Sequence, residues 1–200
     1  MPTTQPEAVL DLARSRGVLR ARDLEPLGIP RTVLTRLVDQ GELLRVGRGL
    51  YVCADAEVTE HHSLAQVSAR VPGSVVNLLS ALAFHGLTDE LPASVWIALP
   101  RGHRTPRLDA PRLELTWTEP RFLTLGVDRH DIEGVQVAIT DPARTVADCF
   151  RYRSRVGVDV AVSALRDFLA RHRTGRDELW RIAGPCRVQS VIRPYLESLS

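Results

Sequence analysis

The fold is constrained most by residues 20–53, which read RARDLEPLGIPRTVLTRLVDQGELLRVGRGLYVC. Two short segments with apolar residues at helical spacing, Arg22–Leu27 and Pro30–Gln40, flank Gly28, and Gly41 ends the second. Two apolar β-type runs then flank Gly47-Arg48-Gly49, whose glycines allow the positive φ of a tight hairpin. This order predicts a winged helix-turn-helix domain over residues 1–56.

The helix before this stretch is predicted from Pro6, which suits a first helical turn, to Gly17, which ends it. In the helix predicted at Pro30–Gln40, which is the third helix of the chain, Leu34, Leu37 and Val38 share one face at helical spacing. We expect that face to be buried and the opposite, polar face to be exposed.

The polar face and the hairpin supply the candidate DNA-binding residues. The second helix of a helix-turn-helix normally lies in the major groove, with its first residues nearest the base edges. Arginine can bind guanine through two hydrogen bonds, and threonine can donate to base or phosphate. Arginines on the hairpin would reach phosphate or the minor groove. The predicted set is Arg22, Arg31, Thr32, Thr35, Arg36, Arg45 and Arg48. Winged helices also serve as protein-docking modules, and exposed arginine is often plain solvated surface, so that alternative stays open.

The basic residues are unusual in type. All 26 are arginine, and lysine is absent. This excludes a Walker lysine, a Schiff-base lysine and a nuclease site that needs lysine, because arginine does not lose its proton. Residues 14–51 hold eight arginines against four carboxylates, and residues 151–193 hold ten against four. These two basic segments favour an anionic partner.

Composition indicates a globular protein without metal or cofactor. No apolar run reaches ~18 residues, and the N-terminus lacks the pattern of a secretory signal, so we expect a cytoplasmic location. Cys53, Cys149 and Cys186 lie far apart without a CxxC spacing, which predicts buried free thiols. The histidines have no Cys or carboxylate at metal-ligand spacing, and we expect structural or surface roles for them.

Residues 57–200 are predicted to form an α+β domain, with helices around a small, mainly antiparallel sheet. We expect Glu57–Thr59 to be a short link. Pro185 is expected to separate the last two helices. Strands are predicted at 94–99, 113–118, 127–132 and 135–139, and helices at 60–71, 78–85, 158–171, 178–182 and 188–199.

Two features of this second part carry charge. Residues 101–112, RGHRTPRLDAPR, are an exposed basic loop that is either plain solvated surface or a site for phosphate or an acidic partner. Asp141 and Pro142 predict a helix start. Arg144 and Asp148 lie four residues apart on that helix, where an exposed pair would contribute only ~0.3–0.5 kcal/mol.

Three strings together resemble one family, the AbiEi-type abortive-infection antitoxins of type IV toxin–antitoxin systems. They are GVLRARDLEPLGIPRTVLTRLVDQGELLRVGRGLYVC (17–53), NLLSALAFHGL (77–87) and ITDPARTVADCF (139–150). The resemblance implies a transcriptional autorepressor that binds inverted repeats in its own promoter DNA. It also implies an antitoxin, acting through its C-terminal part against a nucleotidyltransferase toxin encoded beside it.

Three functional hypotheses follow. The first is a non-enzymatic, DNA-binding repressor and antitoxin. The second is a partner-docking antitoxin whose winged helix touches only protein, or a solitary regulator without a toxin. The third is a nucleic-acid-modifying enzyme, which the missing lysine and the absence of paired carboxylates disfavour.

Overall fold

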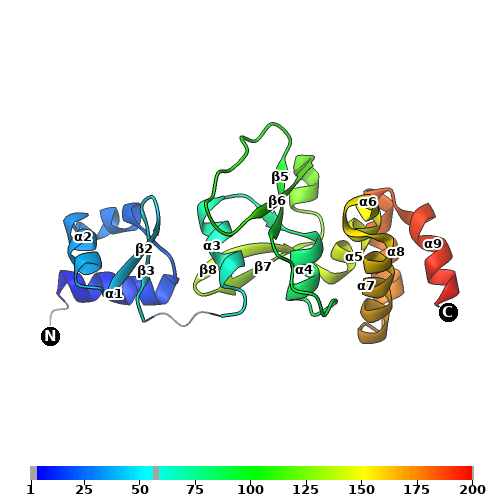
Figure 1. The fold of residues 1–200 in the computed structure, drawn as a ribbon, viewed down its shortest axis with the longest axis horizontal. Helices are drawn as coiled ribbons and strands as arrows, with labels where there is room; N and C mark the ends of the chain where they lie inside the picture. The colour runs from blue at the N-terminus through cyan, green and yellow to red at the C-terminus, as the bar shows by residue number, and fades with distance from the viewer. Residues whose placement is uncertain (1–3, 56–58, 200) are drawn as a thin grey trace. The chain divides into compact units, whose positions relative to one another are not determined.

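The computed structural model describes residues 4–55 and 59–199 of the chain (Figure 1). The chain divides into two compact units. The first unit comprises residues 1–72 and 130–137, and the second comprises residues 73–129 and 138–200. The predicted domain boundary between residues 56 and 57 lies outside the described residues, as does most of the predicted link, 57–59.

The first helix, α1 (Gln5–Arg16), begins at a capping box that joins Thr4 to Glu7. The Glu7 backbone N–H donates to the Thr4 hydroxyl (3.5 Å), and the Thr4 backbone N–H donates to the Glu7 carboxylate (2.8 Å). These bonds satisfy donors that a helix N-terminus leaves unpaired. Pro6 lies in the first turn and Gly17 ends the helix, as predicted from the sequence.

The helix-turn-helix follows. Its first helix, η1 (Ala21–Leu27), is a 3₁₀ helix, and Gly28 follows it with φ +64°. The second, α2 (Thr32–Asp39), begins two residues later than Pro30, the predicted start. The backbone N–H groups of Val33 and Leu34 donate to carbonyls three residues back, so the entry to α2 is a tighter turn.

Three short strands complete the winged helix: β1 (Leu19–Arg20), β2 (Leu43–Gly47) and β3 (Leu50–Cys53). They form an antiparallel sheet in the order β1-β3-β2. The apolar faces of α1, η1 and α2 meet this sheet around one core of Val9, Ala13, Leu19, Leu24, Ile29, Leu34, Leu37, Leu43 and Cys53. The predicted winged helix-turn-helix is therefore the arrangement observed.

Helix α3 (His62–Arg70) and the tip of a hairpin, residues 130–137, also belong to the first unit. The Glu133 carboxylate at that tip accepts hydrogen bonds from the Thr59 backbone N–H (2.8 Å) and hydroxyl (2.9 Å). His62 Nδ1 lies 2.7 Å from the same carboxylate. Gly17 approaches the Glu133 backbone so closely that a Cβ on Gly17 would overlap the Glu133 carbonyl oxygen.

A five-stranded sheet, which belongs to the second unit except for the 130–137 tip, contains β4 (Val75–Val76), β5 (Val95–Pro100), β6 (Leu113–Thr118), β7 (Val127–Ile132) and β8 (Val135–Thr140). The strand order is β6-β5-β4-β8-β7. The β5–β6 and β4–β8 pairs are parallel, whereas β4–β5 is antiparallel. The sheet is thus mixed, and the prediction of a mainly antiparallel sheet was wrong. Alternating apolar residues identify strands but carry no information on their direction.

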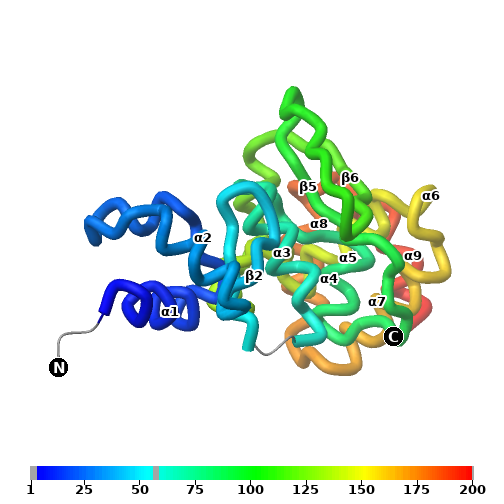
Figure 2. The backbone as a smooth tube through the Cα atoms, turned by 60° about the vertical axis from the view of Figure 1, so that its left-hand side comes forward, coloured from blue at the N-terminus to red at the C-terminus, as the bar shows by residue number. Residues whose placement is uncertain are grey.

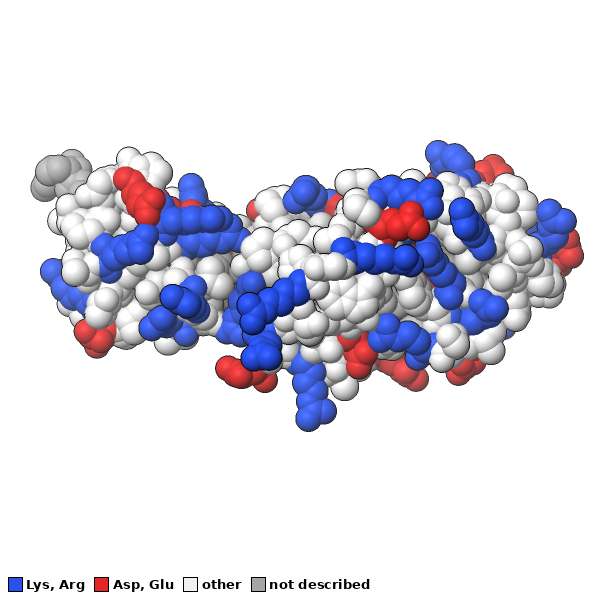
Figure 3. Space-filling model, turned by 90° about the horizontal axis from the view of Figure 1, so that it is seen from above, with Lys and Arg blue, Asp and Glu red and all other residues white. Residues whose placement is uncertain are grey.

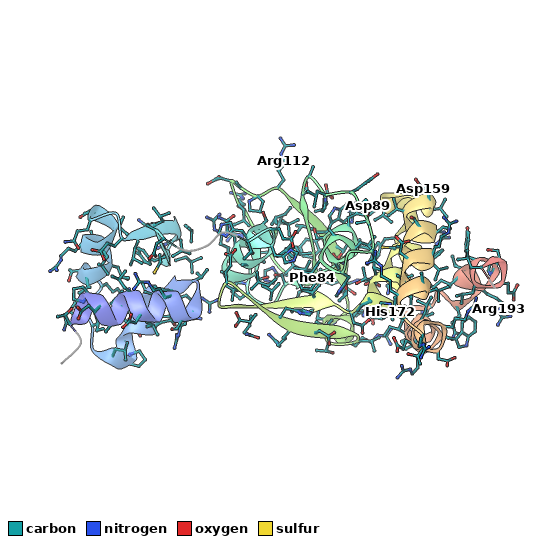
Figure 4. All side chains as sticks on the ribbon, turned by 90° about the horizontal axis from the view of Figure 1, so that it is seen from below. Phe84, Asp89, Arg112, Asp159, His172 and Arg193 are labelled. Carbon is teal, nitrogen blue, oxygen red and sulfur yellow. The ribbon has the colours of Figure 1, made fainter. Side chains whose placement is uncertain are left out.

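The connection between β5 and β6 explains one parallel pair. A parallel pair needs a connection of about a dozen residues to carry the chain back, and residues 101–112 supply it. Figure 2 shows this segment, in bright green, extending away from the sheet. Its four arginines are exposed, and in Figure 4 the labelled Arg112 side chain points outward.

Helices pack around the buried α5 (Pro142–Arg151). They are α4 (Leu78–Phe84), α6 (Arg153–Val156), α7 (Val158–Arg171), α8 (Gly175–Cys186) and α9 (Gln189–Ser198), with a 3₁₀ turn, η2, at Pro120–Leu123. Asp141 caps α5 by accepting from the Arg144 backbone N–H at 2.6 Å, as predicted. Every α5 residue from Ala143 to Phe150 is buried, including Arg144 and Asp148. This helix is therefore the centre of the second core.

One predicted break was wrong. Pro185 does not separate two helices but lies in the last turn of α8, which ends at Cys186. Arg187, with φ +59°, then reverses the chain, and its backbone N–H donates to the Gly184 carbonyl at 2.9 Å. The Val188 backbone N–H donates to the Ala183 carbonyl at 3.0 Å, and the two bonds satisfy carbonyls that a helix end leaves free.

No helix in the described ranges is both long enough and apolar enough to cross a membrane. The three cysteines are free and buried, as predicted.

Candidate nucleic-acid interface

The polar face of α2 is exposed because its apolar face builds the core. Leu34 and Leu37 are each only 1% exposed. Thr32, Thr35 and Arg36 lie on the other side of the helix, spaced three and four residues apart, and all are exposed. Helical periodicity alone therefore places these three side chains on one solvent-facing stripe.

Arg31 immediately precedes α2 and has a carboxylate partner. Its Nη2 lies 2.6 Å from Oε1 of Glu25, with both side chains about two-thirds exposed (67% and 64%). An exposed pair of this kind contributes roughly 0–1 kcal/mol. A phosphate could therefore displace Glu25, but Arg31 is the one predicted arginine that the described residues pair with a carboxylate. No sequence pattern indicated this pair, which spans the turn of the helix-turn-helix.

The wing is a tight hairpin between β2 and β3, with Arg48 and Gly49 at its tip. Gly49 has φ +70°, and its carbonyl accepts the Ala21 backbone N–H at 2.9 Å, which ties the tip to η1. Gly47 does not have positive φ, contrary to expectation. Its role is spatial, because a Cβ there would lie 3.2 Å from Nε of Arg70.

The wing arginines are exposed. The Arg45 Nε donates to the Gly47 carbonyl at 3.3 Å, which orients the guanidinium along the hairpin. Arg48 at the tip is also exposed, as is Arg22 on η1. All seven residues predicted from the sequence to contact DNA are therefore solvent-exposed, which is a precondition for contact.

Some arginines of this unit lie next to a carboxylate and others do not. On α1, Arg14 lies 3.2 Å from Asp55 and Arg16 lies 3.3 Å from Asp23. By contrast, within the described part of the chain, no carboxylate lies within 4.0 Å of the other predicted arginines, Arg22, Arg36, Arg45 and Arg48. Among the exposed arginines of residues 4–55, those without a carboxylate partner are thus four of the five arginines predicted to bind DNA.

Charge on this unit is distributed as separate groups. On the face seen in Figure 3, the winged helix carries several blue arginine groups with a few red carboxylates between them. Such spaced guanidiniums can each meet a phosphate of a nucleic-acid backbone. This arrangement suits binding of a polyanion.

The Arg144–Asp148 pair of α5 is a structural feature. Arg144 Nε lies 3.0 Å from Asp148 Oδ2, with the side chains 4% and 3% exposed, and Arg144 Nη1 donates to the Leu125 carbonyl at 2.6 Å. Burial raises the pKa of Asp148, while the Arg144 guanidinium opposes the shift. The four-residue spacing predicted this ion pair, but we expected it to be exposed. An i,i+4 spacing does not indicate whether a pair is buried.

Three of the histidines, which were expected to have structural or surface roles, make contacts within the protein. His62 pairs with Glu133, and His85 Nε2 lies 2.7 Å from the Thr140 carbonyl oxygen. His172, labelled in Figure 4, stacks on Phe168 with ring centroids 4.5 Å apart. Among residues 4–55 and 59–199, no three His, Cys, Asp or Glu side chains are grouped to hold a metal ion.

Comparison with known proteins directly supports the winged-helix assignment of the first unit. A family model described as "Transcriptional regulator, AbiEi antitoxin" matches residues 7–54. The predicted resemblance to AbiEi-type antitoxins is thus confirmed over the winged helix, from α1 to the end of β3. No curated protein matches the chain.

One solved structure shares the fold over most of the chain. It is the RV2827C protein from Mycobacterium tuberculosis, with a TM-score of 0.60 and 19% sequence identity. The match covers 92% of this chain and 72% of the other. At this identity, the similarity establishes the fold and no more. The α+β architecture of both units is therefore one that an experimentally determined structure also has.

Proposed function

We propose that this chain, whose winged helix is of the AbiEi antitoxin and transcriptional-regulator type, represses transcription by binding its own promoter DNA. The supporting observation is the coincidence of exposure and missing carboxylate partners at Arg22, Arg36, Arg45 and Arg48 within the described ranges. Guanidiniums on a helix-turn-helix and its wing that no carboxylate neutralises suit DNA phosphates and base edges.

In the proposed complex, α2 lies in the major groove. Thr32 and Thr35 face base edges or phosphates, and Arg36 bonds a guanine or the adjoining backbone. Arg45 and Arg48 anchor the wing, while Arg22 on η1 anchors the opposite backbone. Arg31 contacts DNA after release from Glu25. This repressor acts in the cytoplasm and needs no metal or cofactor.

The proposal is tested with DNA from upstream of the gene. Gel shifts with that DNA, and with unrelated competitor of equal length, should show preferential binding. Arg48→Ala should weaken binding to every sequence, whereas Arg14→Ala, on α1 and paired with Asp55, should not. Transcription of a reporter from the same DNA should fall when the protein is present. Absence of both a shift and repression would refute the proposal.

We further propose that the chain is the antitoxin of a type IV pair, with a nucleotidyltransferase as toxin. The second unit supports this role because it has its own core and occupies most of the chain, apart from the DNA-binding module. Co-expression with the product of the adjacent gene should restore growth that this product alone arrests. A chain that shifts DNA but does not restore growth would instead be a solitary regulator.

A further inference from the structure

A hollow of about 240 Å³ in the second unit is walled by arginines. Arg121 follows the first residue of η2, Arg151 ends α5, Arg153 begins α6, and Arg187 lies between α8 and α9. Arg151 and Arg153 are close in sequence, but Arg121 and Arg187 are distant from them, so the basic composition of residues 151–193 did not reveal the convergence of the four. All four belong to the same compact unit.

One carboxylate, Glu119, also lines the hollow, and it lies 3.0 Å from the Nε of Arg121. Arg153 Nη1 donates to the Phe150 carbonyl at 3.0 Å, which fixes its side chain. Within the described ranges, no carboxylate lies within 4.0 Å of Arg151, Arg153 or Arg187. Four guanidiniums therefore face one carboxylate around a space open to solvent.

Aromatic rings hold two of these cations in place. The guanidinium carbons of Arg121 and Arg151 lie 4.7 and 4.8 Å from the centroid of the buried Phe122 ring. Arg151 also lies 5.7 Å from the Tyr152 ring. Stacking positions a guanidinium without neutralising it. The Arg151 guanidinium thus remains available to bind an anion while its orientation is restricted, whereas Arg121 is paired with Glu119.

The remaining wall of the hollow includes the start of a helix. Helix α9 (Gln189–Ser198) has no side-chain cap, and Val188 and Val191 at its start line the hollow. The first backbone N–H groups of a helix carry partial positive charge. This end adds to a site that the arginines already define.

We propose that this hollow binds a phosphate monoester, such as the terminal phosphate of a nucleotide. Arginine binds phosphate through paired N–H···O bonds, and the excess of positive charge matches a group that carries about −1.5 to −2 at neutral pH. The volume admits a phosphate with an attached sugar but not a duplex. The phosphate belongs either to a free mononucleotide or to the 5′ end of a nucleic acid.

The probes are inorganic phosphate, adenosine 5′-monophosphate and adenosine, titrated into the full chain by calorimetry at constant ionic strength set with chloride. Phosphate and the monophosphate should bind, and adenosine should not. Arg151→Gln and Arg187→Gln should each weaken binding by about tenfold or more, the usual effect of removing hydrogen bonds to a charged group. The matched control is Arg166→Gln, an exposed arginine of α7 outside the hollow.

A second arm distinguishes the two sources of phosphate. A short single-stranded oligonucleotide is compared with and without a 5′-phosphate. Tighter binding of the phosphorylated strand than of the monophosphate indicates a nucleic-acid end, and equal binding indicates a free nucleotide. Either conclusion requires that Arg151→Gln and Arg187→Gln weaken the binding.

The proposal is overturned if phosphate does not bind, or if both variants bind it as the unsubstituted chain does. Equal weakening in Arg166→Gln would also overturn it, because the effect would then be one of general charge. Unfolding curves of the variants show whether weaker binding reflects a damaged fold. The assay is independent of promoter binding, so either proposal can fail alone.

Discussion

Single residues of the winged helix illustrate what periodicity can predict. The exposure of Thr32, Thr35 and Arg36 follows from the burial of Leu34 and Leu37, because the two sets alternate at helical spacing. The partner of Arg31 could not be predicted in the same way. Glu25 lies six residues away, across a turn whose geometry depends on Gly28 in the left-handed region.

Arg144 and Asp148 show the opposite case, a pair found from the sequence whose energetic importance was missed. Replacing Arg144 with Met leaves a buried carboxyl without its partner, so we expect the free energy of unfolding to fall by about 3–5 kcal/mol. Adding Asp148→Leu should recover much of that decrease. Urea unfolding of the single and double variants measures the coupling, and a double variant no more stable than the single would contradict it.

At the scale of elements, the sequence predicted positions better than directions. Strands β5 and β6 lie where the alternating residues indicated, yet they are parallel. The length of their connection, residues 101–112, was the available signal, since a hairpin needs far fewer residues. The position of the 130–137 tip within the first unit depends on non-local packing, and no short-range pattern predicts it.

The junction of α1 with that tip yields a matched pair of glycine substitutions. Both glycines have positive φ, but Gly28 (φ +64°, ψ +20°) lies in the left-handed helical region and Gly17 (φ +62°, ψ −55°) lies outside it. Nothing lies within 4 Å of a Cβ built on Gly28. Gly28→Ala should therefore lower the free energy of unfolding by about 1–2 kcal/mol, which is the cost of the left-handed backbone conformation alone. Gly17→Ala should cost clearly more, since its Cβ overlaps the Glu133 carbonyl oxygen. Equal costs in thermal or urea unfolding would show that this approach does not constrain the fold.

Glu133, at the same tip, makes stability depend on pH. Burial raises its pKa, but hydrogen bonds from Thr59 and His62 outweigh burial, so the pKa lies below its ordinary value. A lowered folded pKa gives stability that is present above the unfolded pKa of about 4.3 and is lost as pH falls through the folded pKa.

Glu133→Gln should therefore lower the free energy of unfolding by about 1–2 kcal/mol at pH 7, and by much less at pH 3. Urea unfolding at both pH values measures the difference. Glu42→Gln is the control, because Glu42 is exposed and its side chain makes no ion pair in the described ranges. An unchanged effect of Glu133→Gln across pH would mean that its charge does not matter.

On the scale of the whole molecule, the strings that suggested the family fall into two kinds. Residues 17–53 form the winged helix apart from α1 and lie within the 7–54 match. Residues 77–87 and 139–150 form α4, the end of β8 and α5, which are core elements of the second unit. Core residues indicate a shared fold. The part of the function that depends on exposed side chains therefore rests mainly on the first unit.

The central claim concerns the exposed arginines without carboxylate partners, and the salt dependence of DNA binding tests it most directly. Fluorescence anisotropy with upstream promoter DNA at several salt concentrations gives the slope of log affinity against log salt. Each phosphate that the protein neutralises contributes about 0.9 to that slope. We predict that Arg36→Gln, Arg45→Gln and Arg48→Gln each weaken binding and make the slope shallower by about 0.9 for every phosphate that the removed guanidinium neutralised. Arg14→Gln should change neither affinity nor slope. An unaltered slope in all three variants, or an equal change in Arg14→Gln, would contradict the account.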